Sequence, residues 1–87
     1  MAVLIRHRTP GMTTSQYEEI APPLVEKLKT QPGFMYHVAF MDKGVFTVSE
    51  IWESQEQHDQ WFDANVKPAL PADAEQEVIE LHSVHQP

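Results

Sequence analysis

The pattern of apolar and polar positions along the chain predicts six secondary-structure elements. Dense runs of β-branched and aromatic residues indicate strands, whereas apolar residues spaced three or four positions apart indicate helices. The predicted strands cover residues 2–8, 34–41, 45–52 and 76–85, and the predicted helices cover residues 13–31 and 54–66. The order of elements is therefore strand–helix–strand–strand–helix–strand.

Both predicted helices begin at a capping-box pattern, at Thr13 and at Ser54, each followed three residues later by glutamine. In this pattern the hydroxyl accepts a backbone N–H of the first turn, and the amide bonds back to the capping residue. The apolar stripe of the first helix keeps its phase across Pro22-Pro23, which predicts one kinked helix rather than two. Pro68 and Pro71 are expected to end the second helix.

The element order is that of an α+β, ferredoxin-like split βαβ fold, in which two helices cover one face of a four-stranded antiparallel sheet. The turn at residues 42–44 contains glycine and predicts a hairpin between the second and third strands. We expect the first and third strands to be central and parallel. This would place their C-terminal ends, His7 and Trp52, at one edge of the sheet, together with both helix N-termini.

The second face of the sheet is also expected to be buried. The second predicted strand is apolar on both sides apart from His37, and two helices can cover only one face. At 87 residues the chain forms one domain, residues 1–87, of a size that is marginal as a monomer. The sequence therefore predicts a homodimer that is joined through this face.

Composition excludes several classes of function. The formal net charge of −7, with six lysines and arginines, is opposite to what phosphate binding requires, which argues against nucleic acid. The chain contains no cysteine, so it has no thiol nucleophile and no disulfide. Its longest N-terminal apolar run, residues 2–5, is too short for a signal peptide or a membrane span. We expect a cytoplasmic protein without membrane association.

Residues 45–70 carry most of the candidate chemistry. The third strand ends in Trp52, and the following helix turns His58, Trp61 and Phe62 to one face, which suggests a pocket wall. Trp61 is read first as a core residue, and His58 could be a buried histidine with satisfied hydrogen bonds. No metal site is expected, because His82 and His85, three residues apart in a strand, point to opposite faces.

Glu50 is the candidate catalytic carboxylate. It shares a strand face with Phe46 and Trp52, so it is expected in an apolar layer where it needs a partner. His7, on the neighbouring central strand, is the expected partner and the candidate base. The alternative is that Glu50 lies at a wet cavity edge or pairs with a lysine.

The sequence resembles the dimeric α+β barrel superfamily, and within it the small antibiotic-biosynthesis-monooxygenase-like (ABM) proteins. The resemblance rests on SEIWES followed by a helix with QWF, and on PGF before the second strand. Trp52 matches the tryptophan that ends the third strand of the family's oxygenases and haem degraders, and His7 lies near their asparagine. The family's late arginine has no counterpart after Arg8. The histidine by which haem degraders bind iron is replaced by KPALPAD, so no haem is expected.

The resemblance implies a cofactor-free monooxygenase that acts on phenolic or quinol-type aromatic molecules such as polyketides. His7 would be the base and Glu50 its orienting carboxylate. The predicted substrate-binding residues are aromatic or imidazole side chains: Tyr17, Tyr36, Trp52, His58, Trp61 and Phe62. Two alternatives stay open, namely a polyketide cyclase or isomerase that uses the same base, and a non-catalytic protein that binds small hydrophobic molecules.

Overall fold

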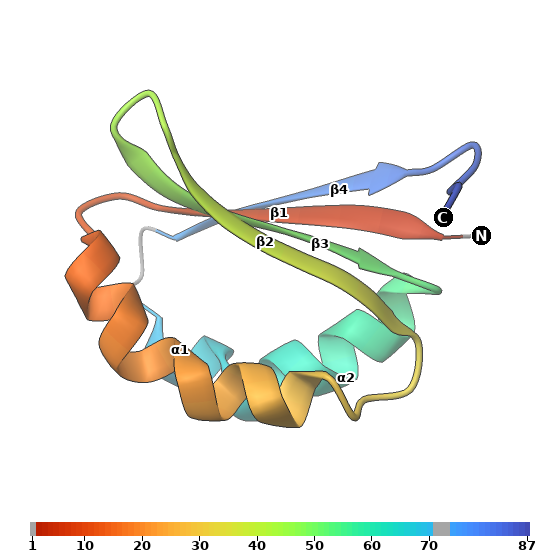
Figure 1. Ribbon diagram of the computed structural model, residues 1–87, viewed down its shortest axis with the longest axis horizontal. Coiled ribbons are helices and arrows are strands. Elements are labelled where there is room, and N and C mark those ends of the chain that lie inside the picture. The colour runs from red at the N-terminus through yellow and green to blue at the C-terminus, as the bar shows by residue number, and fades with distance from the viewer. Residues whose placement is uncertain (1, 71–73) are drawn as a thin grey trace.

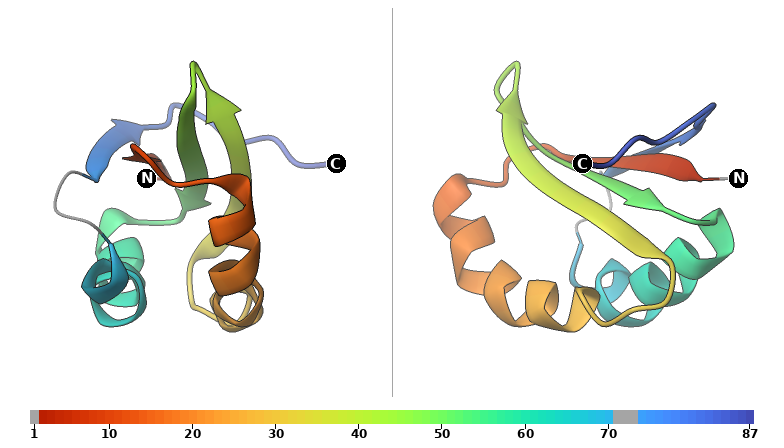
Figure 2. Two further views of the ribbon diagram at one scale, coloured as in Figure 1. Left: turned by 90° about the vertical axis from the view of Figure 1, so that its left-hand side faces the viewer. Right: turned by 45° about the vertical axis from the view of Figure 1, so that its right-hand side comes forward.

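The computed structural model describes residues 2–70 and 74–87, and its four strands form one sheet with both α-helices on the same face (Figures 1 and 2). The elements are β1 (Val3–Thr9), α1 (Thr14–Leu28), β2 (Phe34–Asp42), β3 (Val45–Trp52), α2 (Gln55–Asn65), the 3₁₀ helix η1 (Lys67–Ala69) and β4 (Glu75–Glu80). This is the predicted ferredoxin-like α+β fold. In the part of the chain that the structure describes, no helix combines the length and apolar character needed to cross a membrane.

The sheet has the order β2-β3-β1-β4, and every neighbouring pair is antiparallel. The expectation that β1 and β3 run parallel is therefore wrong. Helix α1 returns the chain so that β2 runs in the same direction as β1, and the hairpin then reverses β3. Val3 consequently lies opposite Trp52, whereas His7 lies opposite Val48.

The two helix N-termini lie at opposite edges of the sheet, which also differs from the expectation. Helix α1 begins next to the end of β1, and α2 begins next to the end of β3 (Figure 1). Because β1 and β3 are antiparallel, these strand ends are far apart along the sheet. The two helix dipoles therefore do not converge on one site.

The β2–β3 hairpin closes through a two-residue turn. Lys43 and Gly44 both have positive φ, at 52° and 81°, as a type I′ turn requires. The pairing then proceeds in register from Asp42 opposite Val45, as far as Tyr36 opposite Ile51.

A β-bulge interrupts this register near the start of β2. Phe34 pairs with Trp52 and Tyr36 pairs with Ile51, so Met35 is the extra residue. Pairing outward from the turn places Tyr36 on the outer face and His37 on the helix-facing one, and the bulge lets Phe34 lie opposite Trp52. The register of the hairpin therefore decides which of Tyr36 and His37 reaches the site.

Helix α1 is continuous through Pro22 and Pro23, as predicted. Its capping box is complete: the Gln16 N–H donates to Thr13 Oγ1 at 3.1 Å, and the Thr13 N–H donates to Gln16 Oε1 at 2.8 Å. The prolines lack the N–H groups that would bond back one turn, and the helix axis bends along its length (Figure 1). Both prolines are exposed, so the bend curves α1 around the sheet.

Helix α2 forms only half of its predicted capping box. The Gln57 N–H donates to Ser54 Oγ at 3.2 Å, but the Gln57 side chain does not bond back to the Ser54 backbone. Its amide instead lies against Gly33, where a side chain on residue 33 would collide with it. The glycine therefore allows the loop before β2 to pack closely on α2.

Strand β4 is shorter than predicted, since it ends at Glu80 rather than at residue 85. Glu80 pairs with Val3, the first residue of β1, and the last bond runs from the Leu81 N–H to the Ala2 carbonyl. Beyond this point β1 offers no further backbone to pair with. Helix α2 is followed by η1, which contains Pro68, whereas residues 71–73, including Pro71, lie outside the described residues.

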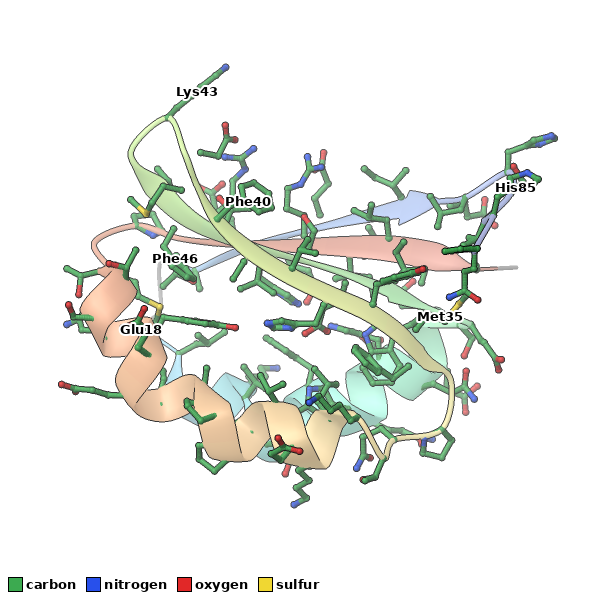
Figure 3. The ribbon with its side chains drawn as sticks, in the orientation of Figure 1. Glu18, Met35, Phe40, Lys43, Phe46 and His85 are labelled. Atoms are coloured by element: carbon green, nitrogen blue, oxygen red, sulfur yellow. The ribbon has the colours of Figure 1, made fainter. Side chains whose placement is uncertain are left out.

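The helix-facing side of the sheet holds the core. Its buried cluster comprises Val3, Ile5, Leu28, Trp52 and Trp61. The two sheet faces differ plainly in Figure 3, where Phe46 points toward the helices and Phe40 points away from them.

The outer face carries an exposed apolar area that no helix covers. A cross-strand row of Tyr36, Ile51, Leu4 and Ile79 runs over all four strands. Tyr36 and Phe40 on β2 are each 38% exposed. This face has the character that the predicted homodimer requires.

Candidate functional site

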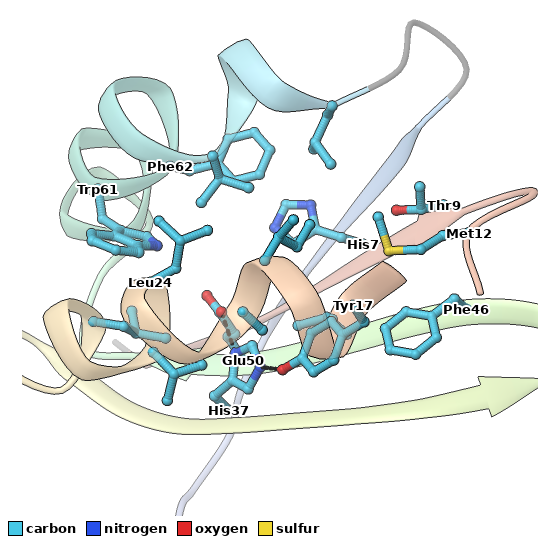
Figure 4. Close-up of a pocket in the computed structure, with 17 residues that line it drawn as sticks. His7, Thr9, Met12, Tyr17, Leu24, His37, Phe46, Glu50, Trp61 and Phe62 are labelled. Carbon is cyan, nitrogen blue, oxygen red and sulfur yellow. Dashed lines mark hydrogen bonds and ion pairs between the residues drawn. The ribbon is translucent and has the colours of Figure 1, made fainter. Parts of the chain in front are cut away.

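A cavity of about 100 Å³ lies between the sheet and the two helices (Figure 4). Its wall is mainly apolar, and its polar groups come from β1, β2, β3 and both helices. The lining residues with polar groups are His7, Thr9, Tyr17, His37, Glu50 and Trp61, the last through its indole N–H.

Four side chains form a continuous hydrogen-bonded chain along one side of this cavity. The Tyr17 hydroxyl and His37 Nε2 are 2.6 Å apart, and His37 Nδ1 and Glu50 Oε2 are 2.7 Å apart (Figure 4). The Trp52 indole N–H donates to the other oxygen, Glu50 Oε1, at 2.9 Å. The imidazole thus lies between a carboxylate and a phenol.

The backbone fixes this arrangement. His37 and Glu50 are directly opposed on β2 and β3, and both point toward the helices. Trp52 follows two residues after Glu50, so it lies on the same face. Tyr17 comes from the first turn of α1, which faces the same part of the sheet, and its ring packs on Phe46 with centroids 4.8 Å apart.

Glu50 acts as the charged acceptor of the chain. Burial acts to raise the pKa of its carboxyl, but hydrogen bonds from His37 and Trp52 outweigh burial and leave this pKa lowered. The carboxylate therefore accepts from His37 Nδ1–H, which leaves Nε2 as the acceptor for Tyr17. Burial, together with the charge of Glu50, raises the pKa of Tyr17, so the phenol keeps its proton and donates it to His37.

A second hydrogen-bonded chain starts at His7. His7 Nε2 and His58 Nε2 are 3.0 Å apart, and His58 Nδ1 lies 2.8 Å from Asp59 Oδ1. His58 is fully buried, whereas the Asp59 side chain is 43% exposed. The His7 ring stacks on Phe62 with centroids 4.5 Å apart. Burial, followed by the neighbouring His58, lowers the pKa of His7 to about 4, so His7 is neutral near pH 7.

The structure brings together most of the residues that the sequence singled out. The predicted site residues that line the cavity are His7, Tyr17, Glu50, Trp61 and Phe62. The expected pairing of Glu50 with His7 is wrong, since Glu50 bonds to His37 and Trp52, and His7 bonds to His58.

Three predicted substrate-binding residues do not line the cavity. Tyr36 is on the outer face, because the hairpin register sets it opposite Ile51. Trp52 and His58 are each fully buried behind the lining residues, where they hold Glu50 and His7. Trp52 and His58 therefore lie one layer further from the cavity than the residues that line it.

Sequence reasoning missed His37, which was not among the predicted site residues. The signal was present in the turn. Pairing outward from a two-residue turn at Lys43-Gly44 sets Asp42 opposite Val45 and, five positions further along each strand, His37 opposite Glu50. The hairpin alone thus gives the pair.

The fold and the cavity together define an α+β protein with a partly open apolar pocket and a hydrogen-bonded acid–base chain at its wall. Residues 1–66 match the family described as antibiotic biosynthesis monooxygenase, and the chain belongs to this family. Among proteins of curated function, none matches the sequence significantly.

Several solved structures share the fold. A haem-degrading protein from Mycobacterium tuberculosis, in its haem-free form, has a TM-score of 0.74 and 17% identity, covering 100% of this chain and 98% of that chain. ActVA-Orf6, a monooxygenase of Streptomyces coelicolor in complex with nanaomycin D, has a TM-score of 0.67 and 16% identity, covering 99% and 91%. SnoaB, a cofactor-independent oxygenase from Streptomyces nogalater, has a TM-score of 0.66 and 13% identity, covering 95% and 94%.

The residues around the cavity do not fit a haem. Nε2 of His7 is bonded to His58, and Nε2 of His37 is bonded to Tyr17, so neither imidazole offers a free nitrogen at that position for iron. A cavity of about 100 Å³ is also far smaller than a porphyrin.

Proposed function

We propose that this protein is a cofactor-independent monooxygenase that acts on phenolic or quinol-type aromatic molecules. The observation that carries the proposal is the Tyr17–His37–Glu50 chain, which ends at the wall of an apolar cavity. A carboxylate that orients an imidazole makes this imidazole a general base. An apolar pocket also keeps water away from the deprotonated substrate, so that hydration does not stabilise its charge before the reaction.

The proton of the substrate hydroxyl passes to Tyr17 Oη as Tyr17 passes its own proton to His37. The resulting phenolate is electron-rich at its para carbon, which transfers electrons to dioxygen and forms a C–O bond. The peroxide takes back, through Tyr17, the proton that His37 held, and the ring proton passes to His7 as the O–O bond breaks. The leaving hydroxide then receives this proton from His7 and departs as water. One oxygen atom becomes the new carbonyl and the other becomes water, so no external reductant is needed.

His7 supplies the proton to the leaving oxygen. This role replaces the one expected from the sequence, in which His7 is the base that removes the proton of the substrate. It lines the cavity, and His58 and Asp59 connect it to solvent. Each imidazole can donate at one nitrogen and accept at the other, so a proton can enter along this chain.

The proposal includes a homodimer that acts in the cytoplasm. The exposed apolar row across the outer face supports the dimer, because monomers seldom leave so continuous an apolar area in water. The cytoplasmic location is the one expected from the sequence.

The test is oxygen uptake with phenol, 1-naphthol and anthrone, which have one, two and three rings and a reactive carbon in the same relation to oxygen. With ¹⁸O₂, we expect one labelled atom in the quinone product. Glu50→Gln keeps the shape of the side chain but removes the charge that orients His37, so the rate should fall about 100-fold or more. Glu56→Gln, on the exposed side of α2, is the matched control and should leave the rate unchanged.

Other outcomes of the oxygen-uptake test would support one of the two alternative functions. A rearranged product without oxygen uptake would indicate a cyclase or isomerase. Binding without any product would indicate a non-catalytic protein. Tyr17→Phe, at a partly exposed position, gives a second check if Glu50→Gln does not fold: it should also lose about 100-fold, because phenylalanine cannot relay the proton.

A further inference from the structure

We infer that the cavity selects neutral phenols of about one ring and excludes phenols that carry a carboxylate. This inference deepens the proposed function and rests on it for the hydroxyl as the reacting group. Three features of the cavity carry it: its volume, the charge of its lining and the position of the Tyr17 hydroxyl.

The volume limits the size of the ligand. Engineered apolar cavities of roughly 150 Å³ take up a benzene molecule, and pockets for drug-sized ligands span roughly 300–1,000 Å³. At about 100 Å³ this cavity is near the lower of these sizes. A single ring is therefore at its upper limit, and a fused polycyclic molecule requires the wall to move.

The lining excludes anions. Among the described residues around the cavity there is no lysine or arginine, and the one carboxylate is Glu50. Both Glu50 oxygens already accept hydrogen bonds, from His37 and Trp52. A second carboxylate in this apolar space would lose its hydration without gaining a cation, which is strongly unfavourable.

The hydroxyl preference follows from the end of the hydrogen-bonded chain. Tyr17 donates to His37 and keeps lone pairs on Oη, so the group that it offers to the cavity is an acceptor. A ligand hydroxyl can donate to it. The same position offers nothing comparable to a methoxy group, which has no proton to donate.

Leu24 and Trp61 limit the cavity on the side of the two helices. Leu24 is on α1, packs against the buried core and is itself only partly buried. Shortening it should therefore enlarge the cavity without breaking the sheet, and Leu24→Ala should admit a second ring.

Calorimetric titration of the intact protein at pH 7 tests the inference with four probes: phenol, anisole, 4-hydroxybenzoate and 1-naphthol. We expect phenol to bind at least about tenfold more tightly than each of the other three. In Leu24→Ala the ratio of the phenol to the 1-naphthol dissociation constant should rise by about tenfold or more. Leu81→Ala, a partly buried leucine that does not line the cavity, is the matched control and should leave this ratio unchanged.

Equal affinity for phenol and 4-hydroxybenzoate would overturn the charge argument, and tight binding of 1-naphthol to the unmodified chain would overturn the size argument. Absence of phenol binding would overturn the inference as a whole. These are equilibrium measurements, so they separate the inference from the proposed function. Phenol that binds selectively but is never oxygenated would refute the function alone, whereas oxygenation of anthrone in preference to phenol would refute the inference alone.

Discussion

Acidification should destabilise this protein through His7. The pKa of His7 falls from the ordinary 6.5 to about 4 in the folded chain, because burial and the neighbouring His58 disfavour its charged form. The unfolded chain regains the ordinary value. This difference between the two states corresponds to about 3 kcal/mol of unfolding free energy.

The sign follows from proton binding. Between pH 6.5 and about 4, the unfolded chain holds a proton on His7 that the folded chain does not. Unfolding therefore takes up close to one proton in this window, and stability decreases as the pH falls. Above pH 7 both states are neutral at His7 and its contribution is constant. The lowered pKa of Glu50 acts in a separate window, since its stabilisation is lost only below its ordinary value of 4.5.

Urea unfolding at fixed protein concentration, at half-unit steps from pH 7.5 to 4.5, measures this effect. We expect most of the loss of about 3 kcal/mol to fall within this range. His7→Gln retains an amide that can bond to His58 but cannot titrate, so its stability should vary much less with pH. His82→Gln, in the exposed C-terminal segment, is the control, and its stability should vary with pH as that of the unmodified chain does. A flat stability between pH 7 and 5, or a His7→Gln variant that titrates unchanged, would refute the reasoning.

Two further predictions concern assembly and the layer behind the cavity. Sedimentation should give twice the 10.0 kDa chain mass, and a folded monomer at micromolar concentration would contradict this. Val38→Lys, at an outer-face position that is 52% exposed, should weaken the dimer. Trp52→Ala should cost about 3–5 kcal/mol of stability in urea unfolding, because the ring is fully buried and its N–H is lost to Glu50. Trp52→Phe should recover most of this stability but not the depressed pKa of Glu50, and full recovery of both would show that the N–H bond contributes nothing.

The sequence patterns predicted the helices and strands well, because short-range features such as turns and apolar periodicity determine where these elements form. The third strand is found at its predicted bounds, the hairpin turn has its expected glycine, and α1 passes through its two prolines as one helix. Strand β4 was predicted too long for a non-local reason. Its own residues continue the strand pattern, but β1 begins at Val3, opposite Glu80, and leaves the residues after β4 no partner on this strand.

The candidate site depended on two features that sequence patterns describe poorly. One is the direction of the strands, which was mistaken for β1 and β3 and led to the wrong edge of the sheet. The other is the register of the β2–β3 hairpin, which sets Tyr36 opposite Ile51 and His37 opposite Glu50. The second strand is apolar on both sides apart from His37, so its own pattern does not show which face His37 takes.

The site residues nevertheless converge, because their facing and their position along the strands agree. The cavity is over the part of the sheet where β1 ends and β3 begins, so a side chain lines it only if it faces the helices and lies in this part. His7 and Glu50 both satisfy this condition, and side chains from α1 and α2 meet them from opposite directions. The consequence for chemistry is two separate proton chains rather than one dyad. One ends in Glu50 and is held inside the protein, whereas the other leads through His58 to the exposed Asp59. A reaction that removes a proton at one step and returns one at another can use both.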